Sequence, residues 1–255
     1  MKACILAAGR GSRLGRRTAE RPKCLIELGG RPLIDWQTTA LCEAGIEEVI
    51  LVTGYRAEML QGYGTRQIHN PRWAQCNMVS SLLCADTAFD GPVIVSYADI
   101  VYHSAPVRAL MAAQGDIVVA YDTDWLDLWS RRFDDPLSDA ESFAVDSQFR
   151  VRDIGRKVAD ISRIQGQYMG LLRITPTALG WIREAVQGRE DGGRTMDMTG
   201  LLARLIDAGH PVHGLPCSGG WCEIDDARDL AVAEALLAEG KLGAAPERPR
   251  LAEIG

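Results

Sequence analysis

The residues best suited to chemistry lie in a basic, glycine-containing loop near the N terminus. Residues 6–14 read LAAGRGSRL, and RPK follows at 21–23. Glycines let backbone N–H groups approach phosphate oxygens closely. The guanidinium of Arg13 can donate two parallel hydrogen bonds to a phosphate, and the ammonium group of Lys23 supplies a point charge. Residues 10–23 include six basic residues and one acid. In a chain of net charge −6, this concentration indicates a polyanion site, whereas the alternative is a solvated basic surface loop.

Two other glycine-rich phosphate motifs are excluded. The dinucleotide fingerprint requires a third glycine where Leu14 stands, and an acid near the end of the second strand, where Thr53 and Gly54 stand. A Walker loop requires Gly-Lys followed by Ser or Thr, which this loop lacks. The loop therefore belongs to another class of phosphate-binding motif.

An aspartate stands at the end of a long apolar run. Residues 92–100 predict a central strand, and Asp99 lies near its carboxyl end. Ligands of open parallel sheets bind beyond the carboxyl ends of the strands, and Mg2+ is usually held by one or two carboxylates together with phosphate oxygens. Asp99 is therefore a candidate metal ligand that faces the basic loop. The alternative is an aspartate that caps a turn or a helix.

Strands and helices alternate through the first 122 residues. Apolar runs predict strands at 2–8, 48–53, 65–69, 92–100 and 116–121. Helical spacing predicts helices at 32–44, 55–60, 78–85 and 106–113. Because this alternation implies right-handed βαβ units, we expect an α/β fold: a Rossmann-like, three-layer α/β/α arrangement with a mixed, mostly parallel central sheet.

The pattern changes after residue 122. We expect strands at 142–145, 151–154, 167–174 and 211–215, and helices at 177–186, 198–208 and 227–238. The chain shows neither an internal repeat nor a linker, so we expect a single domain over 1–239, with halves at about 1–122 and 123–239. The tail, 240–255, is rich in Ala, Pro, Glu and Arg and is expected to be mobile.

The composition excludes several classes of protein. The 255 residues are 47% hydrophobic and 24% charged, which is typical of a globular chain. The pI near 5.3 argues against general nucleic-acid binding, and no apolar run reaches the roughly 18 residues of a transmembrane helix. Seven scattered cysteines without a CxxC pair are typical of reduced thiols. We therefore expect a cytoplasmic monomer or homodimer that binds neither nucleic acid nor membranes.

The basic loop also resembles a known signature. GxGxR followed by PK is similar to the loop of the sugar-phosphate nucleotidyltransferase superfamily. Three later stretches resemble its small cytidylyltransferase branch, which activates phosphocholine, phosphonates and phosphoglutamine. These stretches are SYADIVY at 96–102, DPLSDAE at 135–141 and GGWCEID at 219–225. The likeness extends over about residues 1–235 and implies a nucleotidyltransferase whose first half binds the nucleotide and whose second half binds the acceptor.

The resemblance implies roles for five charged residues. Asp99 and Asp225 would hold Mg2+, although Asp225 precedes a helical run and can also be its N-cap. Arg13 would bind the β- and γ-phosphates of CTP, and Lys23 the α-phosphate and the acceptor phosphate. Lys157 would also bind the acceptor phosphate, unless it is an exposed loop lysine. Because a phosphate dianion is already a good nucleophile, the protein mainly positions the partners and neutralises charge.

Further contacts to both substrates are implied by the same resemblance. The nucleotide contacts are Leu6, Ala7, Ala8, Gly9, Arg10, Gly11, Ser12, Asn77, Ser80 and Ala98. The acceptor contacts are Tyr102, Arg131, Asp139, Glu141 and Trp221. An amide at Asn77 can read a pyrimidine edge, which favours cytosine without excluding UTP; the alternative is that Asn77 caps the following helix.

The segment 124–141 combines six acids with three aromatic residues at four-residue spacing. The aromatic residues are Trp125, Trp129 and Phe133. One interpretation is an amphipathic helix that packs an aromatic stripe and leaves its acids in solvent. The other is a site for an acceptor that carries an ammonium group, met by an acid or an aromatic face.

Together these features predict Mg2+-dependent transfer of CMP from CTP to a small phosphate or phosphonate acceptor, with release of pyrophosphate. The acceptor would be of the phosphoglutamine, phosphonate or phosphocholine type. One alternative is a sugar-1-phosphate nucleotidyltransferase using UTP or dTTP, although the short chain leaves little room for the elaborations of sugar enzymes. Another is an inactive nucleotide-binding sensor, against which the joint presence of the four charged residues at 13, 23, 99 and 225 counts.

Overall fold

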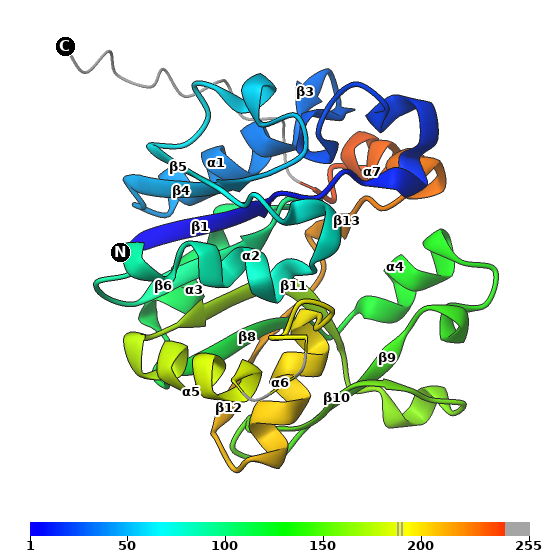
Figure 1. Ribbon diagram of the computed structural model, residues 1–255. Coiled ribbons are helices and arrows are strands. Elements are labelled where there is room, and N and C mark those ends of the chain that lie inside the picture. Colours follow the sequence, from blue (N-terminus) through cyan, green and yellow to red (C-terminus); the bar gives the residue numbers. More distant parts are fainter. Residues whose placement is uncertain (188, 190, 243–255) are drawn as a thin grey trace.

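A seven-stranded sheet crosses the molecule, with helices on both sides of it (Figure 1). The computed structural model describes residues 1–187, 189 and 191–242, so most of the tail predicted to be mobile lies outside the described residues. The strands are β1 (Lys2–Ala7), β4 (Glu48–Thr53), β5 (Arg66–His69), β6 (Val93–Tyr97), β8 (Ile117–Asp122), β11 (Gln167–Ile174) and β12 (Val212–Cys217).

The order of the strands is β12-β8-β11-β6-β1-β4-β5. Strand β11 is antiparallel to both of its neighbours, β6 and β8, whereas all the other neighbouring pairs of this sheet are parallel. Strands from both halves of the chain therefore share one sheet. The predicted mixed, mostly parallel sheet is confirmed.

The side chains of β1 alternate between the two faces of the sheet. Ala3, Ile5 and Ala7 pack on one face, and Cys4 and Leu6 pack on the other, and all five are buried. A parallel strand that is covered on both faces has a continuous apolar sequence. This is why the sequence alone predicted β1 to within one residue.

Two helical layers cover the sheet (Figure 1). The core of one face includes residues of α1 (Leu33–Glu43), α3 (Ser104–Ala112) and α7 (Ala227–Ala238), together with α4 (Trp125–Arg132). The core of the other face includes residues of α2 (Met78–Cys84), α5 (Pro176–Val186) and α6 (Met198–Asp207). Each of these helices buries one stripe of apolar side chains, as the helical spacing predicted. The three-layer α/β/α arrangement is therefore confirmed.

Three short antiparallel pairs complete the strands. They are β2 (Glu27–Leu28) with β3 (Arg31–Pro32), β9 (Glu141–Val145) with β10 (Val151–Lys157), and β7 (Ile100–Tyr102) with β13 (Trp221–Glu223). Strand β13 was not predicted, because three residues are too few to show a period and its partner lies far away in the sequence. The helix expected over 55–60 is a short 3-10 helix, Ala57–Leu60.

The strand predicted over 92–100 is wrong at its carboxyl end. Strand β6 ends at Tyr97, and Asp99 lies in the turn before β7 begins at Ile100. The buried side chain of Gln37 on α1 donates from Nε2 to the carbonyl oxygens of Tyr97 (3.1 Å) and Ile100 (2.6 Å). This amide therefore joins α1 to backbone acceptors on both sides of the turn at which the chain leaves the sheet.

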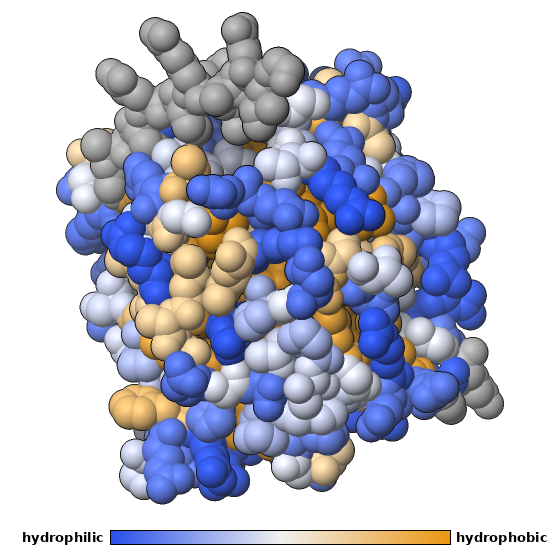
Figure 2. Space-filling model, turned by 90° about the vertical axis from the view of Figure 1, so that its left-hand side faces the viewer, coloured by the Kyte–Doolittle hydropathy of each residue, from blue (hydrophilic) through white to orange (hydrophobic). Residues whose placement is uncertain are grey.

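The face of the molecule drawn in Figure 2 is mainly polar. Figure 2 shows hydrophilic residues over most of one face of the molecule, with smaller apolar patches between them. Among the described residues, none of the helices combines the length and the apolar character needed to cross a membrane. All seven cysteines have free thiols, as their scattered spacing predicted.

Replacement of Gln37 by leucine is expected to destabilise the fold. The carbonyl oxygen of Ile100 would lose this buried hydrogen bond, whereas that of Tyr97 still accepts from Ser96 Oγ at 2.9 Å, and the loss costs about 1–3 kcal/mol in free energy of unfolding. Urea unfolding followed by circular dichroism measures this change. Gln114→Leu is the control, because Gln114 is exposed and its substitution should stay within about 0.5 kcal/mol of wild type. A Gln37→Leu variant as stable as the control would contradict the role given to this amide.

Candidate active site

The basic loop follows β1 directly and folds back onto the side chain of Lys23. Gly11 has a φ of +70°, and a Cβ at this position would lie 2.7 Å from the Cβ of Lys23. Only glycine combines this backbone conformation with so close an approach. The hydroxyl of Thr18 donates to the carbonyl oxygen of Gly11 (2.8 Å) and closes the loop. The loop therefore holds the Lys23 side chain against the backbone of the loop at Gly11.

A cavity of about 310 Å3 opens beside this loop. Its walls come from β1, the loop, the start of α2, the β6–β7 turn and the segment before α7. The lining residues are Leu6, Ala7, Gly9, Gly11, Ser12, Arg13, Lys23, Cys24, Asn77, Ala98, Asp99 and Asp225. The sequence predicted all of them as site residues except Cys24, which is buried and gave no signal of its own. We call this space the loop cavity.

Three predicted nucleotide contacts lie beside the loop cavity rather than in its wall. Ala8 is buried, and its carbonyl oxygen accepts the N–H of Tyr55 at 3.0 Å. The guanidinium of Arg10 lies over the Tyr55 ring, 5.4 Å from its centre. Ser80 is buried within α2. A role for these three residues in nucleotide binding stays a prediction.

Three carboxylates meet beside the loop cavity, two of them, Asp99 and Asp225, in its wall. Asp99, Glu223 and Asp225 each offer an oxygen, and these oxygens lie within 4.8 Å of one another. Asp99 comes from the β6–β7 turn and the other two from the end of β13. The N–H of Ile224 donates to the carbonyl oxygen of Asp99 at 2.9 Å and joins the two segments. We call these three residues the carboxylate cluster.

Glu223 was missed by the sequence analysis. It stands two residues before Asp225, and in an extended chain residues i and i+2 point to the same side. That spacing within GGWCEID was the available signal. The alternative interpretation of Asp225 as the N-cap of α7 is wrong, since Asp226 is the cap and accepts from the N–H groups of Arg228 and Asp229.

The ammonium group of Lys23 lies between two members of the cluster. Its Nζ is 2.6 Å from Asp99 Oδ2 and also pairs with Asp225 Oδ1, while Arg13 Nη1 is 2.5 Å from Asp225 Oδ2. Burial opposes the charge on Lys23, but the two carboxylates outweigh it and raise the pKa of the lysine. Desolvation likewise opposes the charge on Asp225, but Lys23 and Arg13 lower the pKa of that carboxyl.

The donor set of the cluster fits a hard divalent cation. Burial raises the pKa of Glu223 to about 7, with Arg132 opposing the rise and the charges of Asp225 and Asp99 adding to it. Asp99 Oδ1 is buried and has no hydrogen-bond partner among the described residues. Close carboxylates repel one another, and a bound cation with oxygen ligands relieves that repulsion. The cluster could therefore hold a metal ion.

A second cavity, of about 210 Å3, shares Arg13 and Asp225 with the loop cavity. Five acids line it: Asp139, Glu141, Asp197, Glu223 and Asp225. Four aromatic residues also line it: Tyr97, Trp129, Phe143 and Tyr168. Among the described residues of this lining, Arg13 is the only one with a basic side chain. The space, which we call the acidic cavity, therefore suits a positively charged group.

Two of the five predicted acceptor contacts line the acidic cavity. Asp139 Oδ2 accepts the indole N–H of Trp129 at 3.1 Å. Burial raises the pKa of Glu141, and the charges of Asp197 and Asp139 add to the rise. Both carboxyl groups therefore face the cavity from the segment that the sequence indicated.

The other three predicted acceptor contacts have partners elsewhere. The buried phenol of Tyr102 donates to Ser96 Oγ at 3.0 Å, and the buried indole of Trp221 donates to Asp122 Oδ2 at 2.9 Å. Arg131 Nη1 is paired with Glu239 at 2.9 Å. None of these three residues lines the acidic cavity.

Lys157 also lies outside the two cavities. Its Nζ donates to the carbonyl oxygens of Ser138 (3.2 Å) and Asp139 (3.0 Å) on an exposed part of the surface. Lys157 thus supports the backbone that carries Asp139. A direct role at the acceptor phosphate stays a prediction.

Two residues combine a structural contact with a place in a cavity wall. In α4, Trp125 and Trp129 of the predicted aromatic stripe are buried, whereas Phe133 follows the helix and is half-buried. Trp129 also lines the acidic cavity, and a role for it in acceptor binding stays a prediction. Asn77 is the N-cap of α2, with Oδ1 accepting the N–H of Met78 at 2.8 Å, and it lines the loop cavity as well. A structural role does not exclude a site role for either residue.

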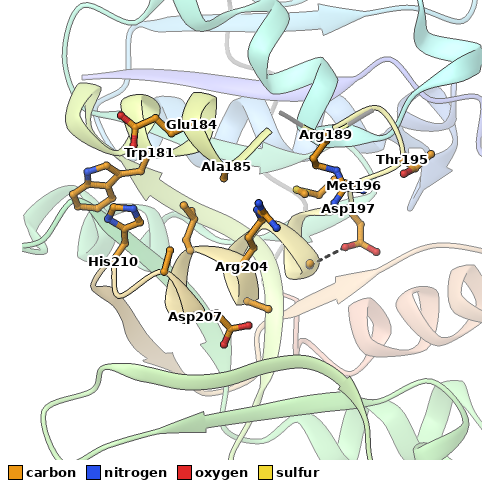
Figure 3. Close-up of a pocket in the computed structure, with 14 residues that line it drawn as sticks. Trp181, Glu184, Ala185, Arg189, Thr195, Met196, Asp197, Arg204, Asp207 and His210 are labelled. Atoms are coloured by element: carbon orange, nitrogen blue, oxygen red, sulfur yellow. Dashed lines mark hydrogen bonds between the residues drawn. The ribbon is translucent and has the colours of Figure 1, made fainter. Parts of the chain in front are cut away.

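A hollow of about 720 Å3 lies between α5 and α6 (Figure 3). Trp181 stacks on His210 at one end of it, with ring centres 4.4 Å apart. Arg204 points into its middle, and Asp197 lies toward the other end. The described residues that line this hollow include neither the glycine loop nor the carboxylate cluster, so its size alone does not make it the active site.

Comparison with known proteins gives the family. The family model of the MobA-like NTP transferase domain matches residues 3–213. The CTP:phosphoglutamine cytidylyltransferase of Campylobacter jejuni is 33% identical over 251 residues, which is 91% of this chain and 98% of that protein. The choline-phosphate cytidylyltransferase of Streptococcus pneumoniae is 41% identical over 86 residues, covering 32% of this chain and 38% of that protein.

Solved structures show the same fold. The inositol-1-phosphate CTP transferase from T. maritima superposes with a TM-score of 0.73 at 19% identity, covering 96% of this chain and 98% of that chain. The CTP:phosphocholine cytidylyltransferase from Streptococcus pneumoniae gives 0.69 at 23% identity, covering 92% and 98%. The chain is therefore a nucleotidyltransferase, and it belongs to the family of MobA-like NTP transferase domains.

Proposed function

We propose that this nucleotidyltransferase uses Mg2+ to transfer CMP from CTP to a small phosphate or phosphonate acceptor, with release of pyrophosphate. The observation that carries the proposal is that the glycine loop, Lys23 and two carboxylates of the cluster, Asp99 and Asp225, line one cavity, with Glu223 adjacent to both carboxylates. The relative from Campylobacter jejuni supports CTP as the donor and phosphoglutamine as the type of acceptor, because it matches over nearly its whole length.

The reaction requires little covalent chemistry from the protein. An acceptor phosphate oxygen forms a bond to the α-phosphorus of CTP, and the bond from that phosphorus to pyrophosphate breaks. Arg13 binds the β- and γ-phosphates, and Lys23 neutralises charge at the α-phosphate. Mg2+, held by Asp99 and Asp225 with Glu223 adjacent, would neutralise charge on the phosphate oxygens. The chain therefore acts by placing two anions together and balancing their charge.

The amide of Asn77 favours cytosine. Its oxygen is occupied by the N–H of Met78, so the group that remains for a ligand is the NH2 donor. Cytosine offers acceptors at O2 and N3, whereas uracil carries an N–H at position 3. Uracil also has acceptors at O2 and O4, so this donor favours CTP over UTP where it lies opposite position 3 of the base.

The acidic cavity favours an acceptor that carries an ammonium group. Its phosphate end would lie toward Arg13, and its cationic end toward Asp139 and Glu141, with Trp129 beside them. Charge-assisted hydrogen bonds and aromatic faces both stabilise a cation in a partly dry space. Phosphoglutamine, aminoethylphosphonate and phosphocholine all meet this description, whereas glucose 1-phosphate does not.

A pyrophosphate-release screen tests the proposed function. It crosses CTP, UTP, dTTP, ATP and GTP with phosphoglutamine, aminoethylphosphonate, hydroxyethylphosphonate, phosphocholine and glucose 1-phosphate, each with and without Mg2+. We expect release with CTP, with an ammonium-bearing acceptor and with Mg2+. Release with UTP or dTTP and glucose 1-phosphate would favour a sugar-nucleotide enzyme instead. Nucleotide binding without turnover on any acceptor would favour a sensor.

Replacement of Asp99 by asparagine is expected to remove most of the activity. The cluster would lose one of its anionic oxygens, so kcat should fall about 100-fold or more, while the unfolding free energy should change by only about 1 kcal/mol. The pyrophosphate assay and urea unfolding measure the two effects. Asp90→Asn serves as the control, because Asp90 is exposed and pairs with Lys2 at the surface. Near-normal turnover by Asp99→Asn would remove Asp99 from the metal site.

Replacement of Asp139 by asparagine is expected to weaken discrimination between acceptors. The matched pair is aminoethylphosphonate and hydroxyethylphosphonate, which differ in an ammonium and a hydroxyl group. The variant keeps the oxygen that accepts from Trp129 but loses the charge, so kcat/KM should fall about tenfold for the amine alone. Asp160→Asn, at an exposed turn, is the control. An unchanged ratio between the two acceptors would show that Asp139 does not meet the cation.

A further inference from the structure

A buried arginine lies behind the carboxylate cluster. Arg132 is the last residue of α4 and is only 2% exposed. Its Nε and Nη2 donate to the two carboxylate oxygens of Asp229 at 2.8 and 3.1 Å, and Nη2 lies 3.2 Å from Glu223 Oε2. One guanidinium therefore binds a member of the cluster and a second, buried acid at the same time.

Asp229 extends this contact to a second member of the cluster. It is 3% exposed, and its Oδ2 accepts the backbone N–H of Asp225 at 2.8 Å. A planar guanidinium that binds a carboxylate through two parallel hydrogen bonds fixes its orientation as well as its position. The chain of contacts from Arg132 through Asp229 therefore holds the backbone at the point where Asp225 leaves β13.

Stability alone gives little reason for these buried charges. Removing two charged groups from water costs several kcal/mol for each ion, and a well-packed apolar pair of similar volume is often equally stable. Here the contacts instead lead directly to two of the three carboxylates that could hold a metal. The position of these contacts indicates that they hold the carboxylates of the cluster in place.

We propose that Arg132 is a positioning residue for nucleotidyl transfer. It holds Glu223 directly and Asp225 through Asp229, so that the carboxylate cluster keeps its shape when a divalent cation binds. This inference rests on the proposed function, because it assigns Arg132 to the metal site of that reaction. Arg132 itself lines neither cavity.

The same helix also forms a wall of the acidic cavity. The Arg132 guanidinium lies 4.9 Å from the centre of the Trp129 ring, and the Trp129 indole donates to Asp139. Helix α4 therefore connects Asp139 in the acidic cavity with Glu223 in the cluster through two adjoining side chains. This helix therefore fixes the wall of the acidic cavity relative to the carboxylate cluster.

The test compares the whole chain with Arg132→Lys, Arg132→Met, and the double variant Arg132→Met with Asp229→Asn. Lysine keeps the positive charge but cannot donate two parallel hydrogen bonds to the Asp229 carboxylate. The double variant removes the uncompensated charge that could unfold Arg132→Met, and its new amide oxygen can still accept from the N–H of Asp225. Arg228→Met is the matched control, because Arg228 lies beside Asp229 on α7 but pairs with Asp134 on the surface.

Two measurements on the folded proteins separate positioning from a purely structural role. Titration with Mn2+ alone, followed by the electron paramagnetic resonance signal of the free ion, gives the dissociation constant without turnover. We expect it to rise about 10- to 100-fold in all three Arg132 variants and to stay unchanged in Arg228→Met. In the pyrophosphate assay, kcat of the same variants should fall as their metal affinity weakens, while the KM for the acceptor stays the same.

Several outcomes would overturn the proposal. Suppose that folded Arg132→Lys, or the folded double variant, has the Mn2+ affinity and kcat of wild type. This result would show that the Arg132 guanidinium does not position the cluster. A loss of thermal stability with unchanged metal affinity would assign Arg132 to the fold alone. Failure of the wild-type chain itself to bind Mn2+ and to release pyrophosphate would instead overturn the proposed function.

Discussion

The ammonium group of Lys23 lies between two carboxylates that reach it from distant parts of the chain, and the geometry of the site depends on this contact. Asp99 leaves the sheet at the turn after β6, and Asp225 follows β13. Partly buried charges attract one another more strongly than charges in water, so the contact resists separation. It requires Gly11, because any larger residue would occupy the space that the lysine side chain crosses.

The same contact places opposite charges where the proposed reaction requires phosphates to be bound. Carboxylates alone would repel a nucleoside triphosphate, and a basic loop alone would bind any polyanion. With Lys23 and Arg13 against the cluster, the site offers cations to phosphate oxygens and carboxylates to a metal within one small cavity. This combination distinguishes the loop cavity from the larger hollow between α5 and α6, whose described lining does not include the carboxylate cluster.

Sequence patterns predicted those features that depend on neighbours in the chain. The strands at 48–53 and 167–174 and the helix at 227–238 have the predicted bounds, because a buried strand and an amphipathic helix each show their period locally. Half of the twelve residues that line the loop cavity lie in residues 6–14, where one local pattern marked them as candidate site residues. Glu223 was missed although its spacing from Asp225 was a local signal. The Arg132–Asp229 pair was not predicted, since it joins two segments that no local pattern connects.

The arrangement of the two cavities has a consequence for how an acceptor is oriented. They share Arg13 and Asp225, so a molecule in the acidic cavity reaches the loop cavity through the end where Arg13 lies. A phosphate is attracted to that end, and the carboxyl groups of Asp139 and Glu141 repel it from the other. In the proposed reaction, an acceptor with a phosphate at one end and an ammonium at the other would therefore be held in one direction by charge, with its phosphate toward the nucleotide.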